Sequence, residues 1–209
     1  MILSGKEASK NLYEKLKVRI SNLERTSKLI AIHVGENPAS ATYLRIKEKK
    51  LNELGLGFEL IKFPEDIQQE VLTKKIAELN SDNSITGVIV QLPLPSQLNE
   101  REILDTIDPK KDVDCLTSIN LGKFFVGDGK ILPATPLGVI RLLEYYGIEL
   151  TGKRICVVGR SNLVGKPLAV ALISKSATVT ICHSKTADLY SATTKAEIVI
   201  SAVGRPKFL

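Results

Sequence analysis

The chain has 209 residues, of which 44% are apolar and 25% charged, and its net charge is +6. This composition supports a packed core and excludes a disordered chain. The sequence has no Trp and only 5% aromatic residues, which argues against a stacking surface for single-stranded nucleic acid. Because the basic residues are spread along the chain, we expect an enzyme for anionic small molecules and no nucleic-acid partner.

Cysteine usage and the N-terminal sequence indicate a reducing compartment. Cys115, Cys156 and Cys182 form no C-x-x-C pair and are odd in number, so we expect neither a disulfide framework nor a metal site. The N-terminus is polar and lacks the apolar region of a signal peptide. No apolar stretch approaches the roughly 18 residues of a membrane span. We therefore expect a soluble, cytoplasmic protein with no membrane partner.

The first half of the chain alternates predicted helices with short apolar strands. Strands are expected at 29–34, 58–63 and 85–92, and helices at 8–23, 41–54 and 69–79. The strands begin about 28 residues apart with one helix in each gap, which is typical of βαβ units and a parallel sheet. Ligands bind such sheets beyond the carboxyl ends of the strands. Two of these ends lie at Val34–Gly35 and Gln91–Leu92.

The second half begins after an irregular stretch over 108–134. Thr135 is the expected N-cap of the next helix, which ends near Tyr146 at Gly147. Strands are then expected at 154–158, 177–182 and 198–203, and helices at 164–174 and 187–195. This β-α-β-α-β order is the mononucleotide-binding half of a Rossmann-type fold. We predict an α/β protein with a three-layer α/β domain at 1–139 and an incomplete Rossmann-type domain at 140–209.

A glycine-containing turn follows the strand 154–158. Gly159 suits the tight turn out of the strand, and Gly165 suits close packing of the next helix. The start of that helix would offer N–H groups to a phosphate, with Arg160 and Ser161 beside it. The spacing is not the common G-x-G-x-x-G, so an ordinary βα turn with two glycines remains an alternative.

The end of the following strand favours NADP over NAD. NAD-binding folds usually carry an acidic residue there, which takes the ribose hydroxyls. Here the segment contains His183, Ser184 and Lys185, with no carboxylate, and Arg160 could reach the same place. These donors suit the extra phosphate of NADP, which a carboxylate would repel. The alternative for His183 is an ordinary loop residue.

Polar residues of the first half form a second candidate site. Tyr43 and Lys47 are four residues apart and share a helix face, although such a pair is also common on solvated helices. Gln91 ends an otherwise apolar strand and must face a cavity or a polar partner if that strand is buried. Asp112 and Asp114 flank Val113 in a loop that could reach the same edge, or could form a solvated acidic turn.

Six segments, taken in order, resemble the bifunctional methylenetetrahydrofolate dehydrogenase/methenyltetrahydrofolate cyclohydrolase family. They span most of the chain and are specific in combination. The segments are VGENPASATYLRIK (34–47), GVIVQLPLP (87–95), KDVD (111–114), PATPLG (133–138), GRSNLVGKP (159–167) and EIVISAVGRP (197–206).

The resemblance implies an enzyme of one-carbon metabolism. The family oxidises methylene-tetrahydrofolate with NADP and hydrolyses the methenyl product to formyl-tetrahydrofolate. By similarity Lys47 is the central catalytic group, Tyr43 and Gln91 support it and contact substrate, and Asp114 holds the pterin ring through its N–H donors. A neutral lysine can activate water at the cationic methenyl carbon, whereas an ammonium would repel that carbon. The resemblance also implies a homodimer.

The sequence departs from the family pattern at two places. Cys115 stands where the family usually has Gly after the Asp, so its side chain could alter the aim of Asp114. The family's usual C-terminal Rossmann elements do not follow Leu209. A catalytically silent or truncated nucleotide-binding relative of the same fold is therefore the alternative. A short-chain dehydrogenase is disfavoured, because its Tyr-x-x-x-Lys pair follows the cofactor loop, whereas Tyr43 and Lys47 precede it.

Overall fold

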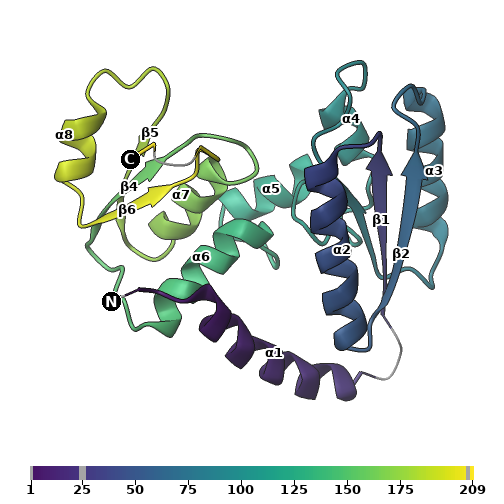
Figure 1. Cartoon of the computed structure of the whole chain (residues 1–209), viewed down its shortest axis with the longest axis horizontal. Helices are drawn as coiled ribbons and strands as arrows, with labels where there is room; N and C mark the ends of the chain where they lie inside the picture. Colours follow the sequence, from purple (N-terminus) through teal and green to yellow (C-terminus); the bar gives the residue numbers. More distant parts are fainter. Residues whose placement is uncertain (1, 24–26, 206–207) are drawn as a thin grey trace. The chain divides into compact units, whose positions relative to one another are not determined.

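The computed structural model describes residues 2–23, 27–205 and 208–209, which form two compact units (Figure 1). One unit is Lys10–Asn120, and the other joins Met1–Ser9 to Leu121–Leu209. The predicted functional boundary at 139/140 falls inside helix α6 (Ala134–Tyr145), whereas the division by contacts lies between Asn120 and Leu121. The division at 120/121 describes packing, whereas the boundary at 139/140 describes function and stays a prediction.

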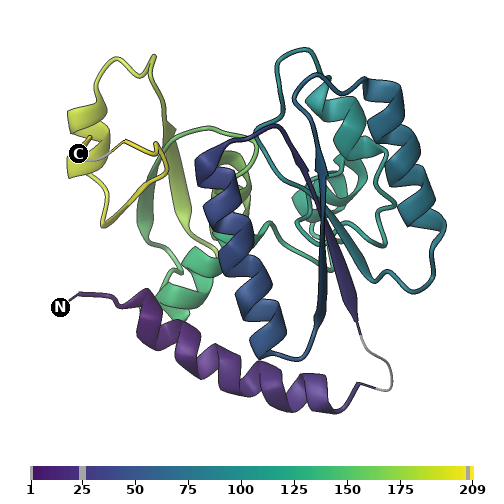
Figure 2. The same ribbon diagram turned by 45° about the vertical axis from the view of Figure 1, so that its right-hand side comes forward.

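The first unit is a three-layer α/β structure. Its parallel sheet has the order β2-β1-β3, formed by β1 (Lys28–Val34), β2 (Gly57–Phe63) and β3 (Gly87–Val90). Helix α2 (Pro38–Glu53) covers one face, and α3 (Gln69–Ser81) covers the other, as Figures 1 and 2 show. Helix α4 (Glu100–Asp105) packs on the α3 side. The predicted α/β class is confirmed for this unit.

Alternation along β1 divides its side chains between the two faces. Ile30, Ile32 and Val34 pack with Leu72 and Ile76 of α3 in the main core. Strand side chains alternate in direction, so the intervening residues of β1 face α2. The central strand is buried on both faces, as expected for a parallel sheet.

Two short helices lie between β3 and α6, and the second of them falls inside the stretch 108–134 that is predicted to be irregular. Helix α4 has 6 residues, and α5 (Ser118–Phe125) has 8. Asn99 caps α4 by accepting a hydrogen bond from the backbone N–H of Glu102. Helix α1 (Gly5–Ser21) has no buried residue, so apolar periodicity alone does not bury it.

The second unit carries a parallel sheet of order β5-β4-β6. Its strands are β4 (Arg154–Val158), β5 (Thr178–Cys182) and β6 (Ile198–Ser201), and its later helices are α7 (Gly165–Ile173) and α8 (Leu189–Thr194). The predicted β-α-β-α-β order is confirmed. The prediction that Thr135 caps α6 is wrong, because the N-cap residue is Pro133 and Thr135 lies inside the first turn.

All three cysteines are buried. Within the described ranges, no helix combines the length and apolar character that a membrane crossing needs.

Candidate functional site

Helix α2 turns Lys47 toward the sheet. The helix begins with Pro38 after Asn37, whose side-chain oxygen accepts a hydrogen bond from the Ser40 backbone N–H at 3.1 Å. Ser40 and Leu44 are the buried residues of the helix, and Lys47 follows on the same face three residues later. The start of the helix therefore determines which face carries the amine.

The structure brings Lys47, Asp114 and Tyr43 together. Lys47 Nζ lies 3.6 Å from Asp114 Oδ2 and 5.2 Å from the centre of the Tyr43 ring. The Lys47 and Asp114 side chains are only 19% and 26% exposed, so this ion pair is better shielded from water than a typical surface pair. Burial, followed by the nearby Asp114 carboxylate, raises the pKa of Tyr43. The phenol therefore remains a hydrogen-bond donor at neutral pH.

Gln91 lies directly after β3 and is partly buried. Its backbone N–H donates to the Ile32 carbonyl, and its side-chain amide donates to the Leu92 carbonyl at 2.8 Å. Among the described residues, no hydrogen bond joins Gln91 to Lys47. The predicted support of Lys47 by Gln91 stays a prediction.

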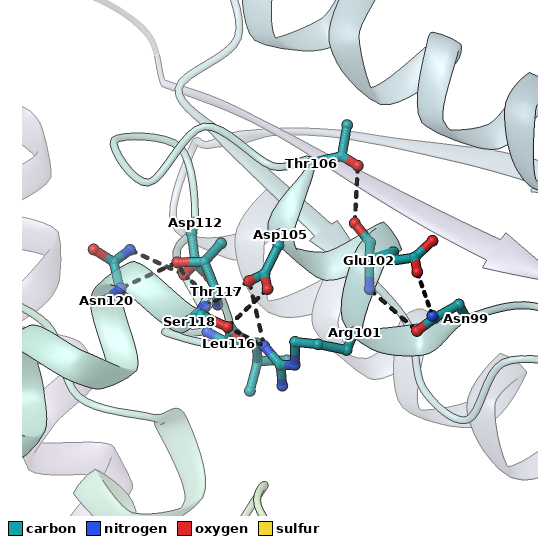
Figure 3. A network of polar contacts seen from close by, with 10 residues as sticks. All are labelled: Asn99, Arg101, Glu102, Asp105, Thr106, Asp112, Leu116, Thr117, Ser118 and Asn120. Carbon is teal, nitrogen blue, oxygen red and sulfur yellow. Dashed lines mark hydrogen bonds and ion pairs between the residues drawn. The ribbon is translucent and has the colours of Figure 1, made fainter.

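The two aspartates of the acidic loop have different environments. Asp112 is 3% exposed and accepts hydrogen bonds from its own loop and the start of α5 (Figure 3). Asp114 instead faces Lys47. Between Asp114 and α5, Cys115 has a φ of 57°, the left-handed conformation that glycine adopts most readily. The loop therefore keeps a glycine-like backbone although it carries a side chain.

His33 of β1 is a buried polar residue that the sequence analysis did not single out. It is 4% exposed, and its Nε2 has no hydrogen-bond partner among the described residues. Burial, together with the charge of Lys62 opposite it on β2, lowers the pKa of His33. A histidine within an otherwise apolar strand was the available sequence signal.

The glycine loop of the second unit is as tight as its sequence predicts. Gly159 has a φ of 129°, and a Cβ there would lie 2.5 Å from the Ala202 carbonyl oxygen. A Cβ on Gly165 would lie 2.1 Å from the Gly159 carbonyl oxygen. Neither position has room for a side chain, because the main chain of the same unit already fills the space that a Cβ would need.

The first N–H groups of α7 are bonded within the loop. Ser161 Oγ accepts from the N–H groups of Val164 and Gly165, and the Ser161 carbonyl accepts from Lys166. Pro167 has no N–H. The expectation of free N–H groups at this helix start is therefore wrong for Gly165 and Lys166. The backbone N–H groups of 160–163 precede them, and no hydrogen bond from these four is found in the described part of the chain.

The segment after β5 forms a turn that organises His183. The His183 N–H donates to Thr186 Oγ1 at 2.8 Å, and His183 Nδ1 accepts from the Lys185 N–H at 3.1 Å. A neutral ring held in this way carries its proton on Nε2, which leaves a donor that faces away from the turn. Ser184 and Lys185 are exposed beside it.

These features define the class of protein: an α/β protein that carries a polar lysine site in one unit and a Rossmann-type half in the other. The family model for the tetrahydrofolate dehydrogenase/cyclohydrolase catalytic domain matches residues 3–114. The model for the NAD(P)-binding domain of the same family matches residues 133–209. The chain belongs to the tetrahydrofolate dehydrogenase/cyclohydrolase family.

Relatives match the chain over almost its whole length. It is 46% identical over 205 residues to the bifunctional protein FolD of Thermus thermophilus, covering 98% of this chain and 73% of the relative. It is 45% identical over 211 residues to FolD of Lysinibacillus sphaericus, covering 100% of this chain and 74% of the relative.

Solved structures of the family share the fold. The bifunctional FolD enzyme of Campylobacter jejuni superposes with a TM-score of 0.95 at 40% identity, covering 100% of this chain and 76% of that one. The Trypanosoma brucei enzyme, complexed with NADP cofactor and inhibitor, gives a TM-score of 0.94 at 32% identity, covering 99% and 72%.

Proposed function

We propose that this protein is an NADP-dependent methylenetetrahydrofolate dehydrogenase and methenyltetrahydrofolate cyclohydrolase. The observation that carries the proposal is the shielded ion pair of Lys47 and Asp114, with the ring of the exposed Tyr43 beside the amine, in a chain of this family. We propose Lys47, Tyr43 and Gln91 as catalytic residues. Tyr43, Gln91 and Asp114 are proposed to bind the tetrahydrofolate substrate.

The Asp114 carboxylate has two alternative partners, the Lys47 amine and the N–H donors of the pterin. Without substrate, the Asp114 carboxylate pairs with the Lys47 amine. Pterin N–H donors that bind Asp114 would compete with Lys47 for the same oxygens. Release from Asp114 would leave the amine available at the methenyl carbon. In its neutral form, Lys47 can then take a proton from the water that attacks that carbon.

The glycine turn and the segment after β5 fit NADP. Gly159 and Gly165 let the strand, the turn and the helix pack closely, and we propose that Ser161 lines the turn for the phosphates while Arg160 reaches the additional phosphate of NADP. Nearby, the Nε2 donor of His183 suits the additional phosphate of NADP, as do the Ser184 and Lys185 side chains. NADP, when bound, accepts the hydride from the methylene carbon. We accordingly propose a folate-binding catalytic domain at 1–139 and a cofactor domain at 140–209.

Replacement of Lys47 by Met tests the catalytic assignment. K47M keeps much of the apolar length of the side chain but has no amine, so we expect hydrolysis of added methenyl-tetrahydrofolate to fall about a hundredfold or more. Lys49→Met, on the same helix but exposed, is the matched control and should retain the wild-type rate. Hydrolysis by K47M at the wild-type rate would remove Lys47 from the mechanism. An inactive wild-type chain would favour the silent relative.

Replacement of Arg160 by Ala tests the cofactor assignment. We expect the KM for NADP to rise about tenfold or more, because one charge-assisted hydrogen bond is lost, while the KM for NAD changes little. Arg141→Ala is the control, since Arg141 is exposed in the same unit and pairs with Glu144. Equal effects of R160A on both cofactors would contradict a contact between Arg160 and the additional phosphate.

We also propose that the protein works in the cytoplasm as a homodimer. The homodimer comes from the family resemblance, and the location comes from the three buried cysteines, which suit a reducing compartment. Sedimentation equilibrium of the purified chain decides the assembly. A mass of one 22.9 kDa chain at all concentrations would refute the dimer.

A further inference from the structure

Asp112 is a buried carboxylate at the base of the loop that carries Asp114. It is 3% exposed, although it belongs to a residue type that is almost never buried without partners. The proposed chemistry does not use it. Its backbone pairs in parallel with Val88 of β3, and its N–H donates to the Asp108 carbonyl at 3.0 Å. The main chain at Asp112 is therefore fixed to the sheet.

Four donors surround the carboxylate (Figure 3). Oδ1 accepts from the Leu116 N–H at 3.1 Å. Oδ2 accepts from the Thr117 N–H at 2.9 Å, the Thr117 hydroxyl at 2.7 Å and the Asn120 side-chain amide at 2.9 Å. Hydrogen bonds to an ionised acceptor are roughly twice as strong as neutral ones, so this carboxylate holds its donors firmly.

These contacts close a ring around residues 113–115. One end of the ring is the Asp112 main chain on β3, and the other is the pair of N–H groups at Leu116 and Thr117. Asp114 lies in the middle of this ring, and Cys115 completes it in the left-handed conformation. Three residues between two fixed points have little freedom, so the direction of Asp114 depends on the bonds that Asp112 accepts.

We propose that Asp112 is the positioning residue for Asp114. Through the ring it keeps the Asp114 carboxylate 3.6 Å from Lys47, where that carboxylate can exchange the amine for the N–H donors of the pterin. This inference rests on the proposed function. The two aspartates then have different roles: the buried Asp112 fixes the conformation of the loop, and the partly exposed Asp114 binds the substrate.

Asp112→Asn is the test, because it preserves size but removes the charge and half of the acceptor capacity. We expect the KM for methylene-tetrahydrofolate to rise about tenfold or more, since small misplacements of binding groups cost this much or more. The KM for NADP should remain within about twofold of wild type. Asp105→Asn is the matched control: Asp105 also accepts from a backbone N–H and a hydroxyl, both of Ser118, but lies outside the ring. It should leave both KM values near wild type.

Labelling of Cys115 supplies a readout besides activity. Cys115 is 0% exposed, as are Cys156 and Cys182, so none should react with iodoacetamide in the folded wild-type chain. In D112N we expect Cys115 alone to react, because the ring opens while the rest of the fold stays closed. Peptide mass mapping identifies the labelled thiol. If D112N does not fold, Thr117→Val removes one donor to Asp112, together with the acceptor of the Asn120 N–H, and should give a smaller change of the same kind.

The outcomes separate this inference from the proposed function. A folded D112N with an unchanged folate KM, or with a lower kcat alone and an unreactive Cys115, would overturn the positioning role. An inactive wild-type chain would refute the proposed function. In that case, labelling of Cys115 in D112N still decides whether Asp112 holds the loop.

Discussion

Replacements of Cys115 can measure the backbone strain in the acidic loop. Its φ of 57° is a conformation that L-residues other than Gly, Asn and Asp rarely adopt. Two replacements isolate the cost of that conformation. Cys115→Ala keeps the Cβ and loses the thiol, while Cys115→Gly loses both. Any contact of the thiol is removed equally in the two variants, so their difference reports on the Cβ alone.

The expected difference follows from two opposing terms. A Cβ in the left-handed region costs roughly 1–2 kcal/mol, which Gly avoids. Gly loses more chain entropy on folding, at a cost of about 0.5–1 kcal/mol relative to Ala. With the middle of each range, we therefore expect C115G to be more stable than C115A by about 0.7 kcal/mol. At an ordinary backbone position the order would be the reverse.

Urea unfolding followed by circular dichroism measures this difference. With a slope of about 2 kcal/mol per molar urea, the midpoint of C115G should exceed that of C115A by roughly 0.2–0.5 M. Ser176, with a φ of 61° in an exposed turn after α7, allows the same pair of replacements in the other unit. A midpoint of C115A equal to or above that of C115G would refute the claim that the loop is strained.

Two further predictions concern packing and pH. Gly165→Ala should destabilise the second unit by about 1–3 kcal/mol, because the new Cβ collides with the Gly159 carbonyl. Gly138→Ala is the control and should not destabilise α6, because a Cβ there meets open space. Thermal unfolding of the two variants measures the difference. In the unfolded chain His33 takes up a proton near its ordinary pKa of 6.5, whereas in the folded chain its pKa is lower. The unfolded state therefore binds the proton first, and the free energy of unfolding falls as the pH drops below 6.5. His33→Leu should flatten this loss in urea midpoints measured between about pH 7.5 and pH 5.5, and an unchanged slope would contradict it.

The sequence predicted the strands better than the short helices. The apolar runs at β1, β2 and β3 are separated by the long helices α2 and α3, so the βαβ pattern is readable. Helices α4 and α5 have 6 and 8 residues, which is too short for a periodic pattern to stand out. Their formation depends instead on tertiary contacts that no local pattern contains.

The candidate site was predictable as a set of residues but not as a geometry. The spacing of Tyr43 and Lys47 on one helix face predicts their proximity, and the structure places the amine near the ring. Spacing alone could not separate Asp112 from Asp114, because both flank Val113, and only the family resemblance singled out Asp114. What separates them is the bridge between Asp112 and Val88 in β3, a pairing of residues far apart in the chain.

The close approach at Gly159 and Gly165 has a consequence for reading glycine patterns in other proteins. Here both positions exclude a side chain through contacts with the protein's own main chain, before any cofactor is considered. A saturation library of this turn, selected only for folding, should therefore still return glycine at both places. Such a glycine pair indicates only that a strand and a helix pack closely. The side chains around the pair determine which nucleotide binds.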